Sequence, residues 1–356
     1  MLFSYIPDVL GLPEDAPEFD RHTSRWHART IGHLFAELGF IVDGVRWDDE
    51  TFIPQRDYDV VFDIYVNLVR WLPYLKPTAI KLVHCTGSDP YYQNLAELAR
   101  IEALTRRRPG LYTPRRLLAH PDRSRYALYV ADACSLLGNE HTLSTYPAQF
   151  HPKMHLVTPS TSYLGATIKS PEALVPPERE FLWYFGTGAV HKGLDLVLEV
   201  FAGHPEWMLN VVGPVIEELD FVALYQRELL GLPNIHYHGS LTPSGEEFRA
   251  ITSRSFCFIA PSCSEATSSA VVTCLRVGLF PIISKDAGVT MPAGCGVTLE
   301  SVSIVAIEAA VSTVLALPEE VLAAQIAQSQ AYAAELFTRE HFRADMRTFI
   351  QQVLQF

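Results

Sequence analysis

The chain has 356 residues, of which 48% are hydrophobic and 19% are charged. This composition is typical of a globular protein, and the length favours two domains over one. The formal net charge of −12 argues against a nucleic-acid-binding surface spread over the whole molecule, so we expect no nucleic-acid partner.

The six cysteines include no CxxC pair, and several lie in apolar runs, where a free thiol behaves as a small hydrophobe. The first twenty residues lack a basic segment, and Pro7 interrupts their apolar run early, unlike a signal peptide. No apolar run approaches the roughly 18 residues of a membrane span. We therefore expect a cytoplasmic protein.

The first half of the chain alternates short apolar runs with amphipathic stretches. Strands are predicted near 1–5, at 40–45, in VVFDIYV, in AIKLVHC, at 132–137 and at 154–157, and helices at 24–38 and 92–106. A stretch rich in Pro, Ser and Thr follows Pro159, and after it the same alternation restarts at FLWYF. From residue 302 onward the pattern is helical, with Thr338 as the cap of a last helix.

Helices that alternate with strands imply parallel sheets covered on both faces. We therefore predict an α/β protein with two doubly wound, Rossmann-like domains facing across a cleft, and a helical C-terminal tail. The predicted limits are an N-terminal Rossmann-like domain at 1–165, a linker at 166–178, a C-terminal Rossmann-like domain at 179–335, and a helix at 336–356 that can pack back on the first domain. Ligands in such sheets bind at the carboxyl ends of the strands.

A lone carboxylate, Glu265, lies in the turn of a predicted strand-turn-helix unit, FCFIA-PSCSEATSS-AVVTCLRV. Ser268 and Ser269 are suited to cap the helix, and its first N–H groups favour an anion such as phosphate. A helix terminus contributes only about 0.3–2 kcal/mol to a bound charge, so a diphosphate needs a cation as well. Lys192, in the turn FGTGAVHKG, is the candidate; a glycine turn with a surface lysine is the alternative.

In order, these segments resemble the C-terminal domain of GT-B glycosyltransferases, closest to the retaining family 4 (group 1) pattern. The matching features are a glycine turn, a KG pair before a helix, VVG, NIHYHGSL, PSxxE, and a helix that ends in glycine before Pro281. The resemblance covers about 120 residues well. Its N-terminal part is weaker and rests on HARTIGHLFAELGFIVDGV, YDVVFDI, AIKLVHCTGSDP and YVADACSLLGNEHTLSTY.

The resemblance implies roles for individual residues. Lys192 would contact the donor diphosphate and Glu265 the donor sugar, and His84, at the end of AIKLVHC, would be the active-site histidine facing the crevice. A packed histidine with a hydrogen-bonded ring is the alternative for His84. The remaining implied donor-binding residues are Gly186, Thr187, Gly188, Gly213, Ser268, Ser269, Ala270 and Thr273.

Two positions depart from the family pattern. Thr187 stands where the family usually has an arginine, and Thr273 stands where a second glutamate usually holds the nucleotide ribose. On the acceptor side we include His22, Arg25 and Asp89. His236 and His238 share one face of a strand but have no further ligand nearby, so we predict no metal site.

Eight arginines lie between Arg100 and Arg125, against only Glu102 and Asp122. This segment could rest on an anionic membrane surface or guide a phosphate-bearing acceptor, and a solvated basic helix end is the alternative.

The sequence thus predicts a metal-independent glycosyltransferase of polysaccharide or glycan biosynthesis, cytoplasmic or peripheral to the inner face of the membrane. It would move a sugar from a nucleotide-diphosphate donor, UDP or GDP rather than another carrier, to a saccharide or lipid-linked acceptor with retention. No cofactor is expected. The alternatives are a sugar-nucleotide 2-epimerase of the same architecture and an inactive homologue acting as a binding or scaffold subunit.

Overall fold

The computed structural model describes residues 1–20, 23–162 and 164–355. Its Cα positions group into two compact units. Unit 1 comprises Met1–Tyr92, Leu118–Ser162 and Phe337–Phe356, and unit 2 comprises Gln93–Leu117 and Tyr163–Leu336. The grouping places residues 93–117, which come from the first half of the chain, with the second unit.

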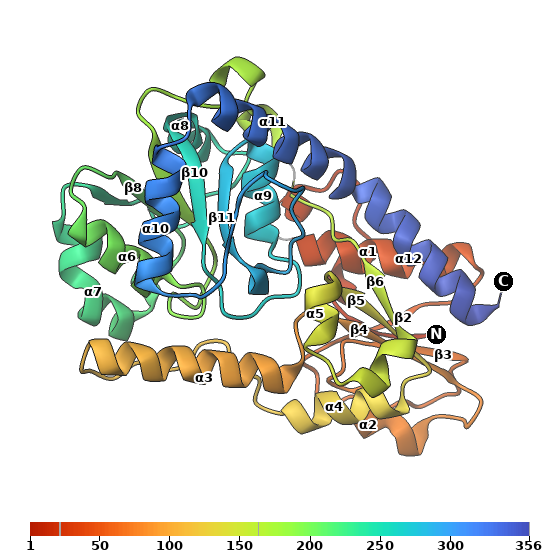
Figure 1. Cartoon of the computed structure of the whole chain (residues 1–356). Coiled ribbons are helices and arrows are strands. Elements are labelled where there is room, and N and C mark those ends of the chain that lie inside the picture. Colours follow the sequence, from red (N-terminus) through yellow and green to blue (C-terminus); the bar gives the residue numbers. More distant parts are fainter. Residues whose placement is uncertain (21–22, 163, 356) are drawn as a thin grey trace. The chain divides into compact units, whose positions relative to one another are not determined.

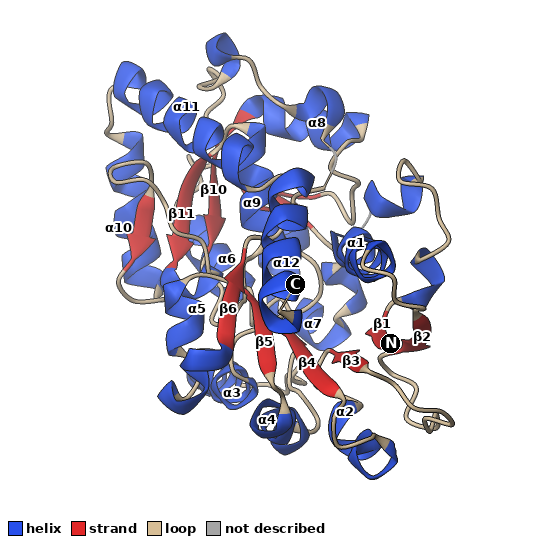
Figure 2. Ribbon diagram, turned by 90° about the vertical axis from the view of Figure 1, so that its right-hand side faces the viewer, coloured by secondary structure: helices blue, strands red, loops and turns tan. Residues whose placement is uncertain are grey.

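Unit 1 is built on a six-stranded parallel sheet of order β2-β1-β3-β4-β5-β6 (Figure 2). Its strands are β1 (Leu2–Tyr5), β2 (Asp43–Arg46), β3 (Val60–Asp63), β4 (Ile80–Cys85), β5 (Ala133–Leu137) and β6 (Met154–Val157). Every residue of β1, β3 and β5 is buried, as expected for strands covered on both faces.

Helices cover both faces of this sheet. They are α1 (Thr23–Glu37), α2 (Leu68–Trp71), α4 (Pro121–Val130), α5 (Glu140–Ser144) and α12 (Arg339–Leu354). Alternation along β3 places Phe62 on the face of α1, where it contacts Phe35, and Val61 on the opposite face, where it packs with α2 and α4. The C-terminal α12 packs on α1, β5 and β6, so the predicted last helix forms and belongs to unit 1.

Unit 2 contains a second six-stranded parallel sheet, of order β12-β11-β10-β7-β8-β9. Its strands are β7 (Glu180–Tyr184), β8 (Leu209–Val212), β9 (Ile235–Tyr237), β10 (Ser255–Ala260), β11 (Phe280–Ser284) and β12 (Val297–Leu299). The strand order reverses between β7 and β10, the position at which doubly wound sheets bind ligands at the carboxyl ends of their strands.

Seven described helices accompany this sheet, and Figure 1 labels them along the chain. They are α3 (Pro90–Arg107, from residue 93 onward), α6 (Leu194–Gly203), α7 (Leu219–Gly231), α8 (Glu246–Arg254), α9 (Ser269–Val277), α10 (Ile304–Leu315) and α11 (Glu319–Leu336). Helix α6 packs against α7 and α10, and α9 packs against α11 and β11. The predicted fold class, two doubly wound α/β domains with a helical C-terminal region, is confirmed.

Candidate functional site

The turn from β7 to α6 places Lys192 next to the loop that follows β10. Gly193 begins α6 in a left-handed conformation with φ +75°, and a Cβ built on it would lie 2.6 Å from the carbonyl oxygen of Pro261. Only glycine relieves both the backbone strain and this close approach. The Lys-Gly pair therefore lets the two loops pack directly on each other.

Two further hydrogen bonds join these loops through His191. The backbone N–H of Cys263 donates to the carbonyl of His191 at 3.0 Å, and His191 Nε2 lies 2.7 Å from the carbonyl oxygen of Ser264. The pKa of His191 is lowered to about 3, chiefly by burial and further by the charge of Lys192. A neutral His191 thus donates to Ser264 and fixes the loop that carries Glu265.

Lys192 and Glu265 form an ion pair at the carboxyl ends of β7 and β10. Only 8% of the Lys192 side chain and 13% of the Glu265 side chain are exposed. Burial opposes ionisation of Glu265, but the charge of Lys192 and the hydrogen bond from Lys192 outweigh it, so the pKa of Glu265 lies below its usual value. The structure brings together the two residues that the sequence assigned to the donor diphosphate and sugar.

The first turn of α9 follows Glu265. Ser268 occupies the N-cap position as predicted, but its side chain makes no capping bond. Its backbone N–H donates to Ala287 in a 3-10 turn (Lys285–Ala287) at 2.9 Å, so this group is not available to a phosphate as we had expected. The N–H groups of Ser269 and Ala270, in the first turn, lack intrahelical partners and remain suited to an anion.

The other predicted donor-binding residues differ in what they can offer. Gly186 and Thr187 are exposed in the β7–α6 turn, whereas the N–H of Gly188 donates to Glu218 at 2.6 Å. Gly213 directly follows β8, and its N–H donates to the carbonyl of Gly239. Thr273 lies inside α9 and is 2% exposed, which leaves it little surface for a ribose.

His84 lies in unit 1, near the carboxyl end of β4, and its ring is fully buried. Its Nδ1 is 2.8 Å from Ser135 Oγ, and its ring packs against Tyr5 and Phe62. Burial lowers the pKa of His84 to about 3. We expected this ring to face an open crevice; the burial favours the alternative interpretation, a packed histidine.

The acceptor-side residues are engaged within unit 1. Arg25 donates to Asp8 at 2.9 Å. Asp89 is 2% exposed, accepts the N–H groups of Tyr91 and Tyr92 at the start of α3, and accepts two bonds from Arg125 at 2.7 and 2.8 Å. His22 lies outside the described residues. Asp89 is therefore built into the protein as a helix cap and is not open to a ligand.

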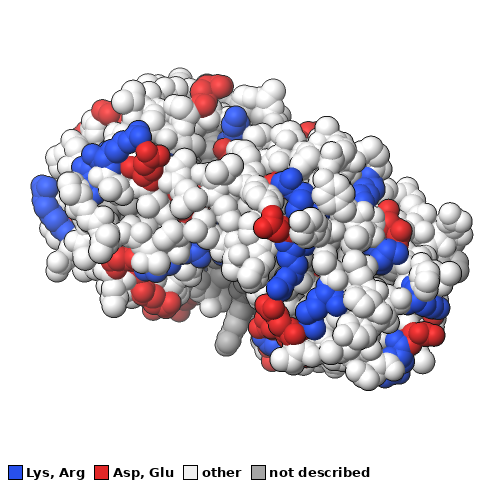
Figure 3. Space-filling view, turned by 90° about the horizontal axis from the view of Figure 1, so that it is seen from below, with Lys and Arg blue, Asp and Glu red and all other residues white. Residues whose placement is uncertain are grey.

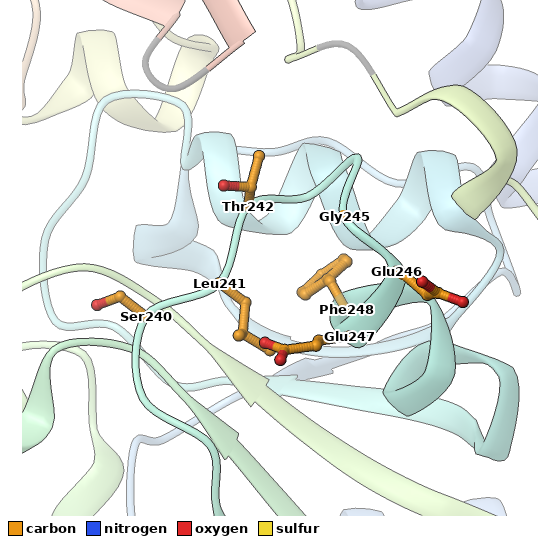
Figure 4. A pocket seen from close by; sticks show the side chains of 7 residues that line it. All are labelled: Ser240, Leu241, Thr242, Gly245, Glu246, Glu247 and Phe248. Carbon is orange, nitrogen blue, oxygen red and sulfur yellow. The ribbon is translucent and has the colours of Figure 1, made fainter.

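A pocket lies elsewhere in unit 2, between the loop after β9 and the start of α8 (Figure 4). It is lined by Ser240, Leu241, Thr242, Gly245, Glu246, Glu247 and Phe248. None of these residues is among the predicted site residues.

The arginines between Arg100 and Arg125 are mostly neutralised. Seven of the eight pair with a carboxylate in the part of the chain that the structure describes; the seven are Arg100, Arg106, Arg107, Arg108, Arg115, Arg123 and Arg125. On the face shown in Figure 3, basic side chains alternate with acidic ones. This pairing removes most of the excess positive charge on which the predicted membrane contact depended.

Two absences hold for the described residues. None of their helices is both long and apolar enough to cross a membrane. They also contain no group of three or more His, Cys, Asp or Glu side chains arranged to hold a metal ion.

Sequence reasoning missed several residues that build this site. Glu218 accepts the N–H groups of Gly188 and Ala189, and Glu97 accepts those of Arg115 and Arg116. Glu97 lies in α3, about 95 residues before Lys192, and nothing in its local sequence indicates this position. His191 did carry a signal, since it directly precedes the Lys-Gly pair.

Part of the sequence matches a known family, and the fold is similar to solved structures. Residues 167–329 match the family described as glycosyl transferases group 1. No curated protein matches the sequence significantly. The fold is similar to that of sucrose-phosphate synthase from Thermosynechococcus elongatus, with a TM-score of 0.71 and 15% identity over 99% of this chain and 98% of that one.

Two other solved structures share the fold over nearly their full length. WaaG, a glycosyltransferase involved in lipopolysaccharide biosynthesis, gives a TM-score of 0.60 at 13% identity, with 98% of this chain and 99% of that chain covered. Anabaena HepE, solved with UDP-glucose, gives 0.61 at 12% identity, with 99% of each chain covered. The chain therefore has the GT-B fold of these glycosyltransferases. Its second unit carries the group 1 glycosyltransferase domain, which includes Lys192, Glu265 and α9.

Proposed function

We propose that the protein transfers a sugar from a UDP- or GDP-sugar to a saccharide or lipid-linked acceptor, with retention of anomeric configuration. The observation that carries this proposal is the Lys192–Glu265 ion pair beside the uncapped first turn of α9. A buried cation and the N–H groups of Ser269 and Ala270 together suit a diphosphate better than either alone.

The geometry supports a division of roles within unit 2. In the structure Lys192 is paired with Glu265. A bound diphosphate would compete for Lys192, which frees the Glu265 carboxylate to accept hydrogen bonds from donor-sugar hydroxyls. Lys192 and the N–H groups of Ser269 and Ala270 would then stabilise the charge that develops on the departing diphosphate.

The transfer step balances without an external reagent. The bond between the anomeric carbon and the diphosphate oxygen breaks, and a bond from that carbon to the acceptor hydroxyl oxygen forms on the same face. The acceptor proton passes to the departing phosphate oxygen. No protein base is needed for this step, which agrees with the burial of His84.

The comparisons support the donor class in general terms. HepE was solved with UDP-glucose, and WaaG acts in lipopolysaccharide biosynthesis. We infer a nucleotide sugar and a saccharide-containing acceptor for this chain from the shared fold and the group 1 domain. We further propose that neither a metal ion nor a cofactor takes part.

One observation favours a second candidate. Both His84 and Thr273 are buried, and Thr273 also replaces the usual glutamate. An inactive homologue that binds sugar nucleotides without turning them over would also show these two features.

A panel of UDP- and GDP-sugars, incubated with the purified protein with and without oligosaccharide or lipid-linked acceptors, tests these candidates. Transfer, or slow donor hydrolysis in the absence of acceptor, supports the proposal. Conversion of the donor sugar to its epimer would identify an epimerase. Protection against heat without any turnover would favour the inactive homologue, and the absence of both binding and turnover would refute the proposal.

A further inference from the structure

One arginine of the basic segment differs from its neighbours. Seven arginines between Arg100 and Arg125 have a carboxylate partner, but the guanidinium of Arg116 has no hydrogen bond or ion pair with any described residue. The residue is exposed. A free guanidinium in a segment where every other arginine is paired is available to an external anion.

The backbone of Arg116 is nevertheless held firmly. The buried carboxylate of Glu97 accepts its N–H at 2.9 and 3.0 Å, and the side chain of Gln93 donates to its carbonyl at 2.5 Å. Both partners lie on α3 and are at most 8% exposed. Glu97 also lies 3.9 Å from Nδ1 of His191, the residue before Lys192. This arrangement positions Arg116 relative to the β7–α6 turn within unit 2.

The side chain of Arg116 runs over that turn. A Cβ built on Gly188 would lie 2.9 Å from Cγ and 3.2 Å from Cδ of Arg116. Gly188 has φ +103°, so glycine is required there both for the backbone and for the passage of this side chain. The positive charge of Arg116 acts on the Lys192–Glu265 ion pair, because it contributes to lowering the pKa values of both residues.

The charges around the β7–α6 turn indicate a role for the guanidinium of Arg116. In the β7–α6 turn Lys192 is the cation closest to Glu265, and it is already neutralised by that carboxylate. Thr187 beside it is uncharged. A diphosphate brings two or more negative charges, which one paired lysine does not balance, and a guanidinium can bind phosphate oxygens in a bidentate manner.

We propose that Arg116 is a donor-binding residue that supplies the second cation for the diphosphate, reaching the β7–α6 turn from the segment after α3. This inference rests on the proposed function, because it assumes that a sugar nucleotide binds at Lys192. It divides the tasks of the segment within unit 2: four paired arginines attach it to the rest of the unit, and Arg116 contacts the ligand. The four are Arg100, Arg107, Arg108 and Arg115.

The test is calorimetric titration of the wild-type protein, R116A, R116K and the control R106A with UDP, UMP, GDP and GMP. Arg106 is a matched control because it lies in the same segment, is exposed and, among the described residues, pairs with Glu102 alone. We expect R116A to weaken binding of the preferred diphosphate by about tenfold or more, because a charge-assisted bond is lost. Binding of the monophosphate should change little, and R116K should lie between R116A and wild type.

The two proposals fail in different ways. If wild-type protein binds neither UDP nor GDP, the proposed function is wrong. If wild type binds one of them and R116A binds it equally well, only the role of Arg116 is wrong. Equal losses for the diphosphate and the monophosphate would also contradict it, since they would indicate a general disturbance of the site. Because Arg116 is exposed, we expect its variants to have the melting temperature of the wild type. If R116A melts at a lower temperature, the affinity of R116K for the diphosphate is compared with that of the wild type instead.

Discussion

At the scale of single residues, the Lys192–Glu265 pair is the part of the site that the sequence predicted and the structure assembles. We expect Lys192→Ala or Glu265→Ala to lower turnover by about 10²-fold or more, the effect of removing one preorganised charge in an enclosed site. Steady-state transfer assays measure this loss. The Lys76→Ala variant, at a half-buried position of unit 1, is the control and should keep wild-type turnover. Wild-type rates in either site variant would contradict the assignment.

Two buried histidines make the stability of the protein sensitive to acid. The pKa values of His84 and His191 are both lowered to about 3, mainly by burial. Between the usual pKa of about 6.5 and pH 3, the unfolded state binds a proton at each site and the folded state does not. The free energy of unfolding therefore falls as the pH falls through this window, by up to about 1.4 kcal/mol per pH unit for each histidine.

Urea unfolding of wild type and His84→Gln checks this dependence. The measurements run from about pH 7 to about pH 4, the range in which unfolded histidines and carboxylates titrate. We expect the variant to lose stability less steeply with falling pH than wild type does. His236→Gln, which changes an exposed histidine, should keep the wild-type slope. Parallel curves for wild type and His84→Gln would show that His84 is not held neutral by its surroundings.

At the scale of elements, the contact between the β7–α6 and β10–α9 loops depends on Gly193. We expect Gly193→Ala to lower the free energy of unfolding by about 1–3 kcal/mol, because the new Cβ would meet the Pro261 carbonyl at a left-handed backbone position. Thermal and urea unfolding measure the loss. Gly203→Ala, at the end of α6 with open space around it, should change stability by no more than about 1 kcal/mol. A Gly193→Ala protein as stable as wild type would contradict this packing.

The attachment of residues 93–117 to α6 depends on Asp195. This carboxylate is fully buried and binds Arg100 at 2.6 Å and Arg107 at 2.5 Å. We expect Asp195→Asn to cost about 3–5 kcal/mol, because it leaves buried guanidinium charge without its partner. In contrast, Glu102→Gln breaks an exposed pair with Arg106 and should cost at most about 1 kcal/mol. Similar losses in urea unfolding for the two variants would show that the buried pair does not hold the segment.

The sequence predicted those elements whose signal is local. The strand, turn and helix around Glu265 appear as expected, and Thr338 caps α12 by accepting the N–H of His341 at 3.0 Å. Helix α4 was not predicted; its first half carries Arg123 and Arg125 of the segment that we interpreted by its charge alone. The acids of unit 2 that pair with Arg100, Arg107 and Arg108 lie about 90–120 residues further along the chain, so no local pattern could reveal them.

At the scale of the whole molecule, the alternation of strands and helices was sufficient to predict two doubly wound parallel sheets, because the central strands of each are buried on both faces. Alternation could not show that residues 93–117 group with unit 2, since that depends on ion pairs between distant parts of the chain. Nor could it show that His84 points into the packed face of its sheet, against Tyr5 and Phe62.

The central claim is that a donor diphosphate binds in unit 2 between the β7–α6 turn and the start of α9. A crystal structure with a bound UDP- or GDP-sugar tests it most directly. We predict diphosphate oxygens within hydrogen-bond distance of Lys192 Nζ and of the backbone N–H groups of Ser269 and Ala270, with Glu265 turned toward the sugar. A nucleotide bound elsewhere, with the Lys192–Glu265 ion pair unchanged, would contradict the account.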